Sequence, residues 1–449
     1  MVCMAGAALA HSSLAAPQGR YARQLADECD ALIALAVKRP YGWAWAAPTS
    51  SGAPERKPPV DMRPPGSPAA GIVLLWAGLL LEEPKYVEAA VHVARGVVAS
   101  QASNGNVVSQ PTFGTTVGKR EPPAAVPDRA ATNAGLALLL AVVGADESKD
   151  EIFRRAALRA TGWLIKQQAH DGGWPSATPE SATDPRVPAR LIRLDDRNVR
   201  DSTLALLLCA SAADDRLAAR AAHKAVEKLL ALRISAPGRW NNLWSTFYRL
   251  NGSLEDDLAD LRPGADMLAS RRVVEVLLTS ALVWPSEAEP ALAAAREAAR
   301  SIRALRDTQG NWMRLYVLSG EQPTPAGESI FGPASTQPSE QLWQSGIFAL
   351  DGMLAAFDRV QELGPERMGQ ELSRSATVQE RLASTIVQLS DSPFVNDRPE
   401  TAEEVDGYLS RHADLWRLLE GPPPEDLNQR VKRLYALLLR TRVEAQFPE

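Results

Sequence analysis

The 449-residue sequence predicts an all-α protein in which helical hairpins close into a ring, an α/α toroid. Glycine-containing corners follow helical segments at residues 105, 172, 238 and 310, which lie 67, 66 and 72 residues apart. This spacing is about the length of two helices with their connections. A hairpin of this length cannot bury its apolar face alone, so successive hairpins must pack side by side, in an open solenoid or a closed ring.

The segment 156–175 shows the pattern most clearly. Ala157, Ala160 and Leu164 recur at helical spacing, and the Asp-Gly-Gly-Trp-Pro sequence that follows cannot continue a helix. Glycine accepts the left-handed conformation that ends a helix, and the indole of Trp174 can cover the exposed end of the helix pair. Related corners are expected at Gly105, at 237–240, at 309–312 and, more faintly, at 41–45.

The remaining elements follow from apolar periodicity and from the positions of proline and glycine. Helices are expected over 18–37, 69–81, 84–101, 136–143, 156–168, up to residue 212, and over 216–233, 269–283, 289–306 and 340–363. Long loops rich in proline, glycine and polar residues are expected at 48–68, 110–127, 176–188 and 319–338. Such loops gather on one face of a ring and build a site there, which favours closure.

Three regions differ in composition. Residues 1–19 are small and apolar, as in a secretory leader, but lack the basic start of a leader; they are either a leader or a disordered tail. Residues 20–363 form the toroid. Residues 364–449 are charged amphipathic helices without the corner sequence, which predicts a separate helical extension of unassigned role.

Composition excludes several classes of partner. The net charge of −5 and the scattered arginines give no basic stripe, so no nucleic acid is expected. The apolar run 71–81 is too short to cross a bilayer, so we expect no transmembrane segment. Cys3, Cys29 and Cys209 are too few for a disulfide framework. We expect a monomer, which is secreted or periplasmic if the leader is genuine.

Four motifs in residues 128–350 resemble, in order, those of the pectate lyases of polysaccharide lyase family 10. Residues 128–133, Asp-Arg-Ala-Ala-Thr-Asn, stand in place of the family's Asp-Asn-Gly-Ala-Thr helix start. A second match is at 168–175, which read Gln-Ala-His-Asp-Gly-Gly-Trp-Pro where the family has a Gln-Tyr-Pro-Asn-Gly-Gly-Trp-Pro turn. The third match is at 191–196, where Leu-Ile-Arg-Leu-Asp-Asp resembles the family's His-Ile-Thr-Phe-Asn-Asp helix start. The fourth is at 312–318, where Trp-Met-Arg-Leu-Tyr-Val-Leu resembles the family's Trp-Ala-Arg-Phe-Tyr-Glu-Ile segment.

The resemblance implies calcium-dependent β-elimination in an acidic polysaccharide, polygalacturonate. A base removes the proton next to the uronate carboxylate, while calcium and cationic side chains neutralise the developing charge. Asp196 matches the family's calcium-associated acid, and Asp195 occupies the adjacent asparagine position. Asp196 has an alternative role as a helix N-cap.

The resemblance also suggests substrate contacts. Arg314 matches the family's arginine after the tryptophan, and Trp174, Trp312 and Tyr316 could offer faces for sugar stacking. Because the tryptophans recur at corners, they could instead be structural plugs.

Two departures bear on catalysis. The family's proposed base is the arginine of an Arg-Asp-Gly sequence, but 315–358 contain neither arginine nor lysine, and 243–249 lack a second calcium-associated aspartate. The chain is then either a divergent lyase with another base, such as Arg249, Arg271 or Tyr248, or a non-catalytic toroid that binds a carbohydrate or a protein.

Triterpene cyclases and prenyltransferases offer another alternative, because they also combine α/α toroids with Asp-Gly-Gly-Trp corners. Their chemistry needs an acidic motif such as Asp-x-Asp-Asp or a zinc triad. Asp195, Asp196 and Asp201 have the wrong spacing for the first, and no zinc triad is evident. This interpretation ranks below the lyase-like one.

Overall fold

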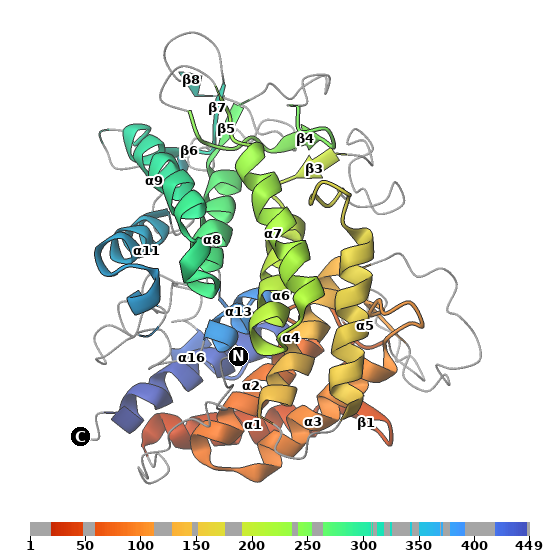
Figure 1. Cartoon of the computed structure of the whole chain (residues 1–449). Coiled ribbons are helices and arrows are strands. Elements are labelled where there is room, and N and C mark those ends of the chain that lie inside the picture. Colours follow the sequence, from red (N-terminus) through yellow and green to blue (C-terminus); the bar gives the residue numbers. More distant parts are fainter. Residues whose placement is uncertain are drawn as a thin grey trace.

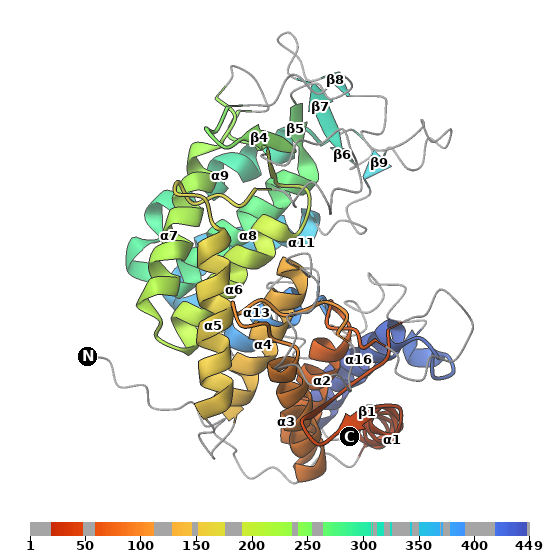
Figure 2. The ribbon, with the colours of Figure 1, turned by 90° about the vertical axis from the view of Figure 1, so that its right-hand side faces the viewer.

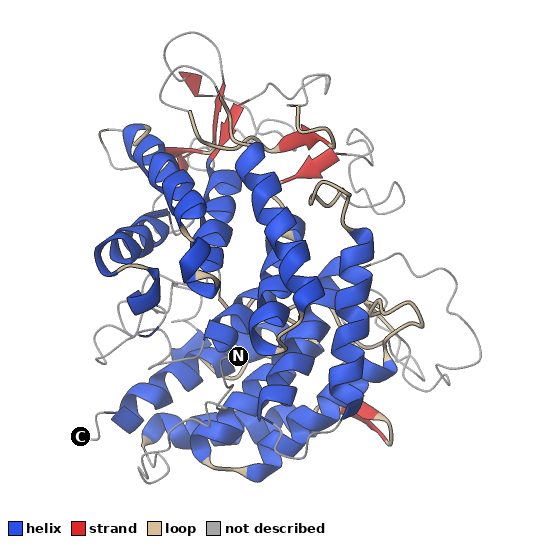
Figure 3. Ribbon diagram, in the orientation of Figure 1, coloured by secondary structure: helices blue, strands red, loops and turns tan. Residues whose placement is uncertain are grey.

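The computed structural model describes a set of helices with a few short strands (Figures 1 and 3). The described residues are 19–47, 59–111, 128–145, 151–175, 191–235, 241–253, 264–306, 308, 312–317, 324–325, 342–343, 350–368, 370, 378–390 and 418–446. The helices are α1 (Arg20–Ala34), α2 (Ser67–Leu81), α3 (Pro84–Ala99), α4 (Arg129–Ala145), α5 (Glu151–Gln167), α6 (Asn198–Ala212), α7 (Arg216–Ala231), α8 (Met267–Val283), α9 (Glu289–Ala304), α11 (Leu350–Leu363), α13 (Val378–Ile386) and α16 (Leu427–Gln446), with a 3₁₀ turn at Pro285–Glu287.

The helices form two layers of an incomplete α/α toroid, as the sequence predicts. Helices α2, α4, α6 and α8 pack on one another in that order and make the inner layer. Each pairs with the helix that follows it, so α3, α5, α7 and α9 make the outer layer. The inner helices are buried on nearly all sides, whereas the outer helices bury one stripe. Because each outer helix reverses the chain, the inner helices run parallel and begin on one side.

The corner tryptophans hold the ends of outer helices. The indole N–H of Trp174 donates to the Leu164 carbonyl at 3.2 Å, and that of Trp312 donates to the Ile302 carbonyl at 2.7 Å. Trp45 makes the same bond to the Leu32 carbonyl at the end of α1. The last carbonyls of a helix have no partner within it, so each indole satisfies one of them while filling the corner.

Trp244 makes the equivalent bond for α7, with its indole N–H 2.7 Å from the Leu229 carbonyl. The sequence pointed to Trp240 for this corner. Residues 236–240, like Gly310, lie outside the described part of the chain.

Glycines let each corner approach the next outer helix. Gly105 and Gly172 have φ of 98° and 103°, and a Cβ on either would lie about 2 Å from a backbone oxygen, of Arg159 in α5 or of Lys224 in α7. A glutamine four residues before each glycine also links the corner to the next outer helix. Gln168 donates to the carbonyls of Gly172 and Ala221, both at 2.9 Å. Gln101 bonds in the same way to the carbonyls of Gly105 and Ala156.

Short strands occupy the corners, mostly at the top of Figure 1, where α6 and α8 begin. The antiparallel pairs join β1 (Val37–Arg39) to β2 (Gly42–Ala44), β3 (Leu191–Arg193) to β4 (Phe247–Arg249), β5 (Gly264–Asp266) to β7 (Leu315–Val317), β7 to β8 (Thr324–Pro325) and β6 (Trp312–Met313) to β9 (Leu342–Trp343). The expected helix over 340–363 was wrong in its first part. Strand β9 lies there, and α11 begins at Leu350.

The two helices described after residue 370 pack against the ring, in contrast to the separate extension that we expected. Helix α16 pairs with α1 and also contacts the inner helix α2. Helix α13 packs on the inner helices α6 and α4, between α16 and α6 in Figure 1. Its residues Arg381–Ile386 are all buried. Figure 2 shows α16 beside α2, at the end of the ring opposite α9. The burial of α13 and the contacts of α16, which the charged composition concealed, join these two helices to the ring.

The corner geometry generates a paired prediction. Gly172→Ala should lower the free energy of unfolding by more than about 1 kcal/mol, because the added Cβ meets the α7 backbone and φ is positive. Gly162→Ala in α5 should raise it by roughly 0.5–1 kcal/mol, because the Cβ there meets nothing and alanine favours a helix. Urea unfolding of both variants measures the difference. Equal effects would contradict the close approach.

Candidate functional site

Four charged residues meet where α6 and α8 begin. We call Arg193, Asp195, Asp266 and Arg314 the strand-face cluster, because β3, β5 and the turn between β6 and β7 position them. Strand pairing brings the segments together: Arg193 lies opposite Phe247 and Asp266 lies opposite Leu315. The cluster therefore joins three corners of the ring.

Asp195 is the centre of this cluster. Arg193 donates to both of its carboxylate oxygens, from Nε at 2.5 Å and from Nη2 at 3.0 Å. Arg314 donates to the same carboxylate from Nη2 at 2.6 Å. The Asp195 side chain is 2% exposed, whereas those of Arg193 and Arg314 are 27% and 31% exposed. A buried carboxylate thus orients two guanidinium groups that reach the surface.

Asp266 links the cluster to helix α8. Its Oδ1 accepts the backbone N–H groups of Leu268 and Ala269, as an N-cap does, and its Oδ2 accepts the Thr246 hydroxyl at 2.7 Å. Burial raises the pKa of Asp266, and the charge of Arg314, whose Nε lies 3.7 Å from Oδ2, opposes this shift. A site at this face is therefore fixed to the start of an inner helix.

A second charged group lies along α6 and α8. Arg197, Asp201, Arg200, Glu275 and Arg271 form the ion ladder, in which cation and anion alternate. Its four contacts measure 2.9, 3.0, 2.9 and 2.9 Å in that order. Except for Arg197, each side chain is at most 7% exposed. The sequence singled out only Arg271 and, for another reason, Asp201, because a helical charge pattern does not reveal which side faces a neighbouring helix.

The structure gives Asp196 a different environment from Asp195. Its Oδ1 accepts the backbone N–H of Asn198 at 2.9 Å and its Oδ2 accepts the Asn198 side-chain amide at 2.8 Å. The residue is partly exposed, and burial, followed by the charge of Asp195, raises its pKa. The N-cap of α6 is Arg197, one residue later than the alternative role expected for Asp196, although Asp196 accepts the first backbone N–H of the helix.

The predicted stacking residues are not available to a sugar. Trp174 and Trp312 are 0% and 1% exposed, and Tyr316 is 5% exposed with its hydroxyl donating to the Leu305 carbonyl. Their assignment as substrate-binding residues is corrected, since their ring faces are covered by packing. The alternative, that the tryptophans are structural plugs, agrees with their bonds to helix ends.

The candidate bases lie at different depths. Arg249 is partly exposed on β4, but Arg271 lies inside the ion ladder. Tyr248 is 2% exposed, its hydroxyl oxygen accepts the Ser245 N–H, and burial raises its pKa. A raised pKa makes a tyrosine less suited to act as a base, so Tyr248 does not fit that role.

The carboxylates at this face do not suit calcium, which takes six to eight oxygen ligands. Both Asp195 oxygens accept guanidinium groups, and both Asp196 oxygens accept groups of Asn198. The described residues contain no set of three or more His, Cys, Asp or Glu side chains placed to hold a metal. Calcium binding stays a prediction from the resemblance.

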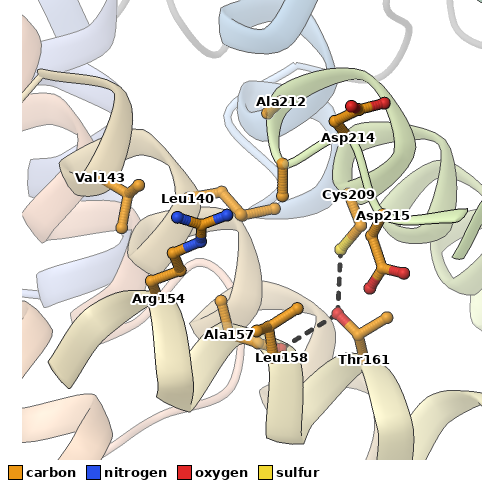
Figure 4. Close-up of a pocket in the computed structure, with 11 residues that line it drawn as sticks. Leu140, Val143, Arg154, Ala157, Leu158, Thr161, Cys209, Ala212, Asp214 and Asp215 are labelled. Carbon is orange, nitrogen blue, oxygen red and sulfur yellow. Dashed lines mark hydrogen bonds between the residues drawn. The ribbon is translucent and has the colours of Figure 1, made fainter. Parts of the chain in front are cut away.

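A separate cavity of about 260 Å³ lies between the α4–α5 and α6–α7 hairpins (Figure 4). Its walls are largely apolar. Inside it, the Cys209 sulfur lies 3.1 Å from the Thr161 hydroxyl, and burial raises the pKa of the thiol to about 12. The thiol therefore stays protonated at neutral pH, and this cavity offers no nucleophile.

No protein-family model and no curated protein matches the chain. Solved structures with a related arrangement include a β-1,3-1,4-glucanase from Paenibacillus sp. X4, with 14% identity, a TM-score of 0.45 and coverage of 94% of this chain and 91% of that one. The unsaturated glucuronyl hydrolase from Bacillus sp. GL1 has 11% identity, a TM-score of 0.46 and coverage of 94% and 96%. A mutant of the family 10 polysaccharide lyase from Cellvibrio cellulosa has 12% identity, a TM-score of 0.41 and coverage of 66% and 98%.

Within the described residues, no helix is long and apolar enough to cross a membrane.

The environment of Asp196 predicts a pH dependence of stability. A carboxyl whose pKa is raised by folding binds its proton more tightly in the native state than in the unfolded state. Its contribution to the free energy of unfolding therefore falls as the pH rises above its pKa in the unfolded state, about 4. Asp196→Asn removes this penalty while keeping an oxygen for the Asn198 N–H. Relative to wild type, the variant should therefore gain stability between pH 3.5 and 7.

Urea unfolding across that pH range measures the difference. Asp27→Asn is the matched control, because Asp27 is exposed on α1. A wild-type advantage that grows with pH would contradict the assignment.

Proposed function

We propose that this chain binds an acidic polysaccharide at the strand-face cluster. The observation that supports this is the pair of partly exposed guanidinium groups of Arg193 and Arg314, held by one buried carboxylate, Asp195. Guanidinium groups bind carboxylates in a planar, two-bonded geometry, and the uronic acids of such a polymer present one carboxylate per sugar. Cations oriented before binding lose little freedom when the ligand arrives.

The reaction that we propose to test at this face is β-elimination, with an arginine as base. The arginine would have to be neutral to accept the proton, and a neighbouring carboxylate favours its charged form. Arg314 and Arg271 each pair with carboxylates, and Arg249 lies on β4 beside the cluster. Arg249 is partly exposed, whereas the Arg271 side chain is 7% exposed, so a polymer reaches Arg249 more easily.

A non-catalytic binder is the second candidate. It is favoured by the pairing of Arg314 with Asp195 and by the saturated carboxylates of Asp195 and Asp196, because the expected base and the expected metal ligands are already engaged. Such a protein would hold the polymer without cleaving it. A lyase would release unsaturated sugars from polygalacturonate, and a non-catalytic binder would not. Absorbance of these products, measured with and without added calcium, separates the two candidates.

The binding proposal predicts a charge-dependent loss in two variants. Arg193→Gln and Arg314→Gln should each weaken binding of polygalacturonate by about tenfold or more, since each removes a hydrogen bond between charged groups. Calorimetry measures the affinity, and circular dichroism confirms that the variants fold.

The control is Arg300→Gln, because the Arg300 side chain is 69% exposed on the outer helix α9. It should bind like wild type, and neutral dextran should not bind at all. Unchanged affinity in both cluster variants would overturn the proposal.

A further inference from the structure

The cavity between the α4–α5 and α6–α7 hairpins lies at the other end of the inner helices from the strand-face cluster (Figure 4). Leu140 and Val143 line it near the end of α4, and Ala212 lines it at the end of α6, whereas the cluster lies where α6 and α8 begin. Its volume is about 260 Å³. An apolar cavity of roughly 150 Å³ holds a benzene molecule, so an aromatic ring with one substituent fits here.

The inner wall of this cavity offers water few hydrogen bonds. The Thr161 hydroxyl donates to the Ala157 carbonyl at 3.0 Å, and the Cys209 sulfur lies 3.1 Å from the same hydroxyl oxygen, so the S–H group donates to it. Figure 4 shows that both bonds stay within the protein. Water at such a wall lacks the roughly two to four polar partners that hold a buried water, and an apolar group displaces it with a gain in affinity.

The outer edge of the cavity adds an exposed apolar side chain. Leu158 lines the cavity and is 45% exposed, whereas Leu140 and Ala157 on the inner wall are 5% and 3% exposed. A ligand in the cavity would cover part of Leu158 as well as the inner wall. Removal of this apolar area from water favours a complex with an apolar molecule.

The charged groups at the edge carry both signs. The Arg154 side chain is 58% exposed, and Asp214 and Asp215 stand opposite it on the turn between α6 and α7 (Figure 4). An acidic ligand would be repelled by the aspartates and a basic one by Arg154, whereas a neutral ligand avoids both repulsions. The contact of Arg154 with Glu151 measures 3.9 Å, longer than a hydrogen bond, so the guanidinium can donate to a ligand oxygen.

We propose that this cavity binds a small neutral molecule that has an apolar body about the size of an aromatic ring and one hydroxyl group. The ring lies against the inner wall, and the hydroxyl oxygen accepts an N–H of Arg154 at the edge. The lining contains no member of the strand-face cluster or of the ion ladder. Binding here therefore does not depend on polysaccharide binding.

Benzyl alcohol, benzoate and benzylamine test the class of ligand, because they share one ring and differ in charge at pH 7. Ligand-detected NMR with the full chain should show that benzyl alcohol binds at least about tenfold more tightly than either charged probe. Equal or tighter binding of benzoate or benzylamine would overturn the neutral class. Binding of none of the three would overturn the site.

Filling the cavity tests its location. Ala212 is partly exposed on the cavity wall, so Ala212→Leu should weaken binding of benzyl alcohol by about tenfold or more, because the larger side chain takes the space of the ring. Ala293→Leu is the matched control, since Ala293 is partly exposed on α9 and does not line the cavity. It should bind like wild type. Wild-type affinity in a folded Ala212→Leu variant would overturn the proposal.

A second substitution tests the edge even if Ala212→Leu fails to fold. Leu158→Ala removes a half-exposed part of the wall and should weaken binding of benzyl alcohol by about threefold to tenfold. Leu217→Ala is its matched control, because Leu217 is 59% exposed on α7 outside the cavity lining. An equal effect of these two substitutions would contradict the proposal.

Polygalacturonate separates this site from the strand face. Ala212→Leu and Leu158→Ala leave the strand-face cluster intact, so both should bind polygalacturonate with wild-type affinity. Arg193→Gln should in turn bind benzyl alcohol like wild type. Failure of one proposal therefore leaves the other standing, and loss of both ligands in a folded Ala212→Leu variant would contradict the independence of the two sites.

Discussion

The closeness of each corner to the next outer helix is the constraint on which this toroid depends. Gly105 and Gly172 bring backbone against backbone, and a side chain at either position would collide with the neighbouring helix. At the corners of Trp174 and Trp312, the indole N–H donates to a carbonyl near the end of an outer helix. The corners thus set both the separation of successive hairpins and the termination of the outer layer.

This arrangement also explains where charge can be placed. The corners bring β3, β5 and the turn after β6 to the starts of α6 and α8, where backbone N–H groups favour acidic side chains. Asp266 satisfies such groups directly, and Asp195 collects the two arginines that flank it. A ring built from parallel inner helices therefore has one side on which capping carboxylates and their counter-ions accumulate.

Inside the ring, the inner helices carry charges as well as apolar residues. Arg200 and Glu275 lie on different helices and are buried together, so their pairing requires α6 and α8 to keep a fixed register. Each carboxylate of the ion ladder serves two arginines, so the ladder ties α6 to α8 through shared contacts.

The sequence by itself determined the hairpin repeat, most helix bounds and the corner at Gly172, because apolar periodicity and glycine conformation are local properties. It also brought Asp195 and Arg314 into one hypothesis, although by resemblance. Tertiary structure alone decided that Trp174 and Trp312 are covered, that Asp195 rather than Asp196 meets the arginines, and that α13 and α16 pack on the ring. These outcomes depend on contacts between segments far apart in the chain, and such contacts leave no periodic trace in the sequence.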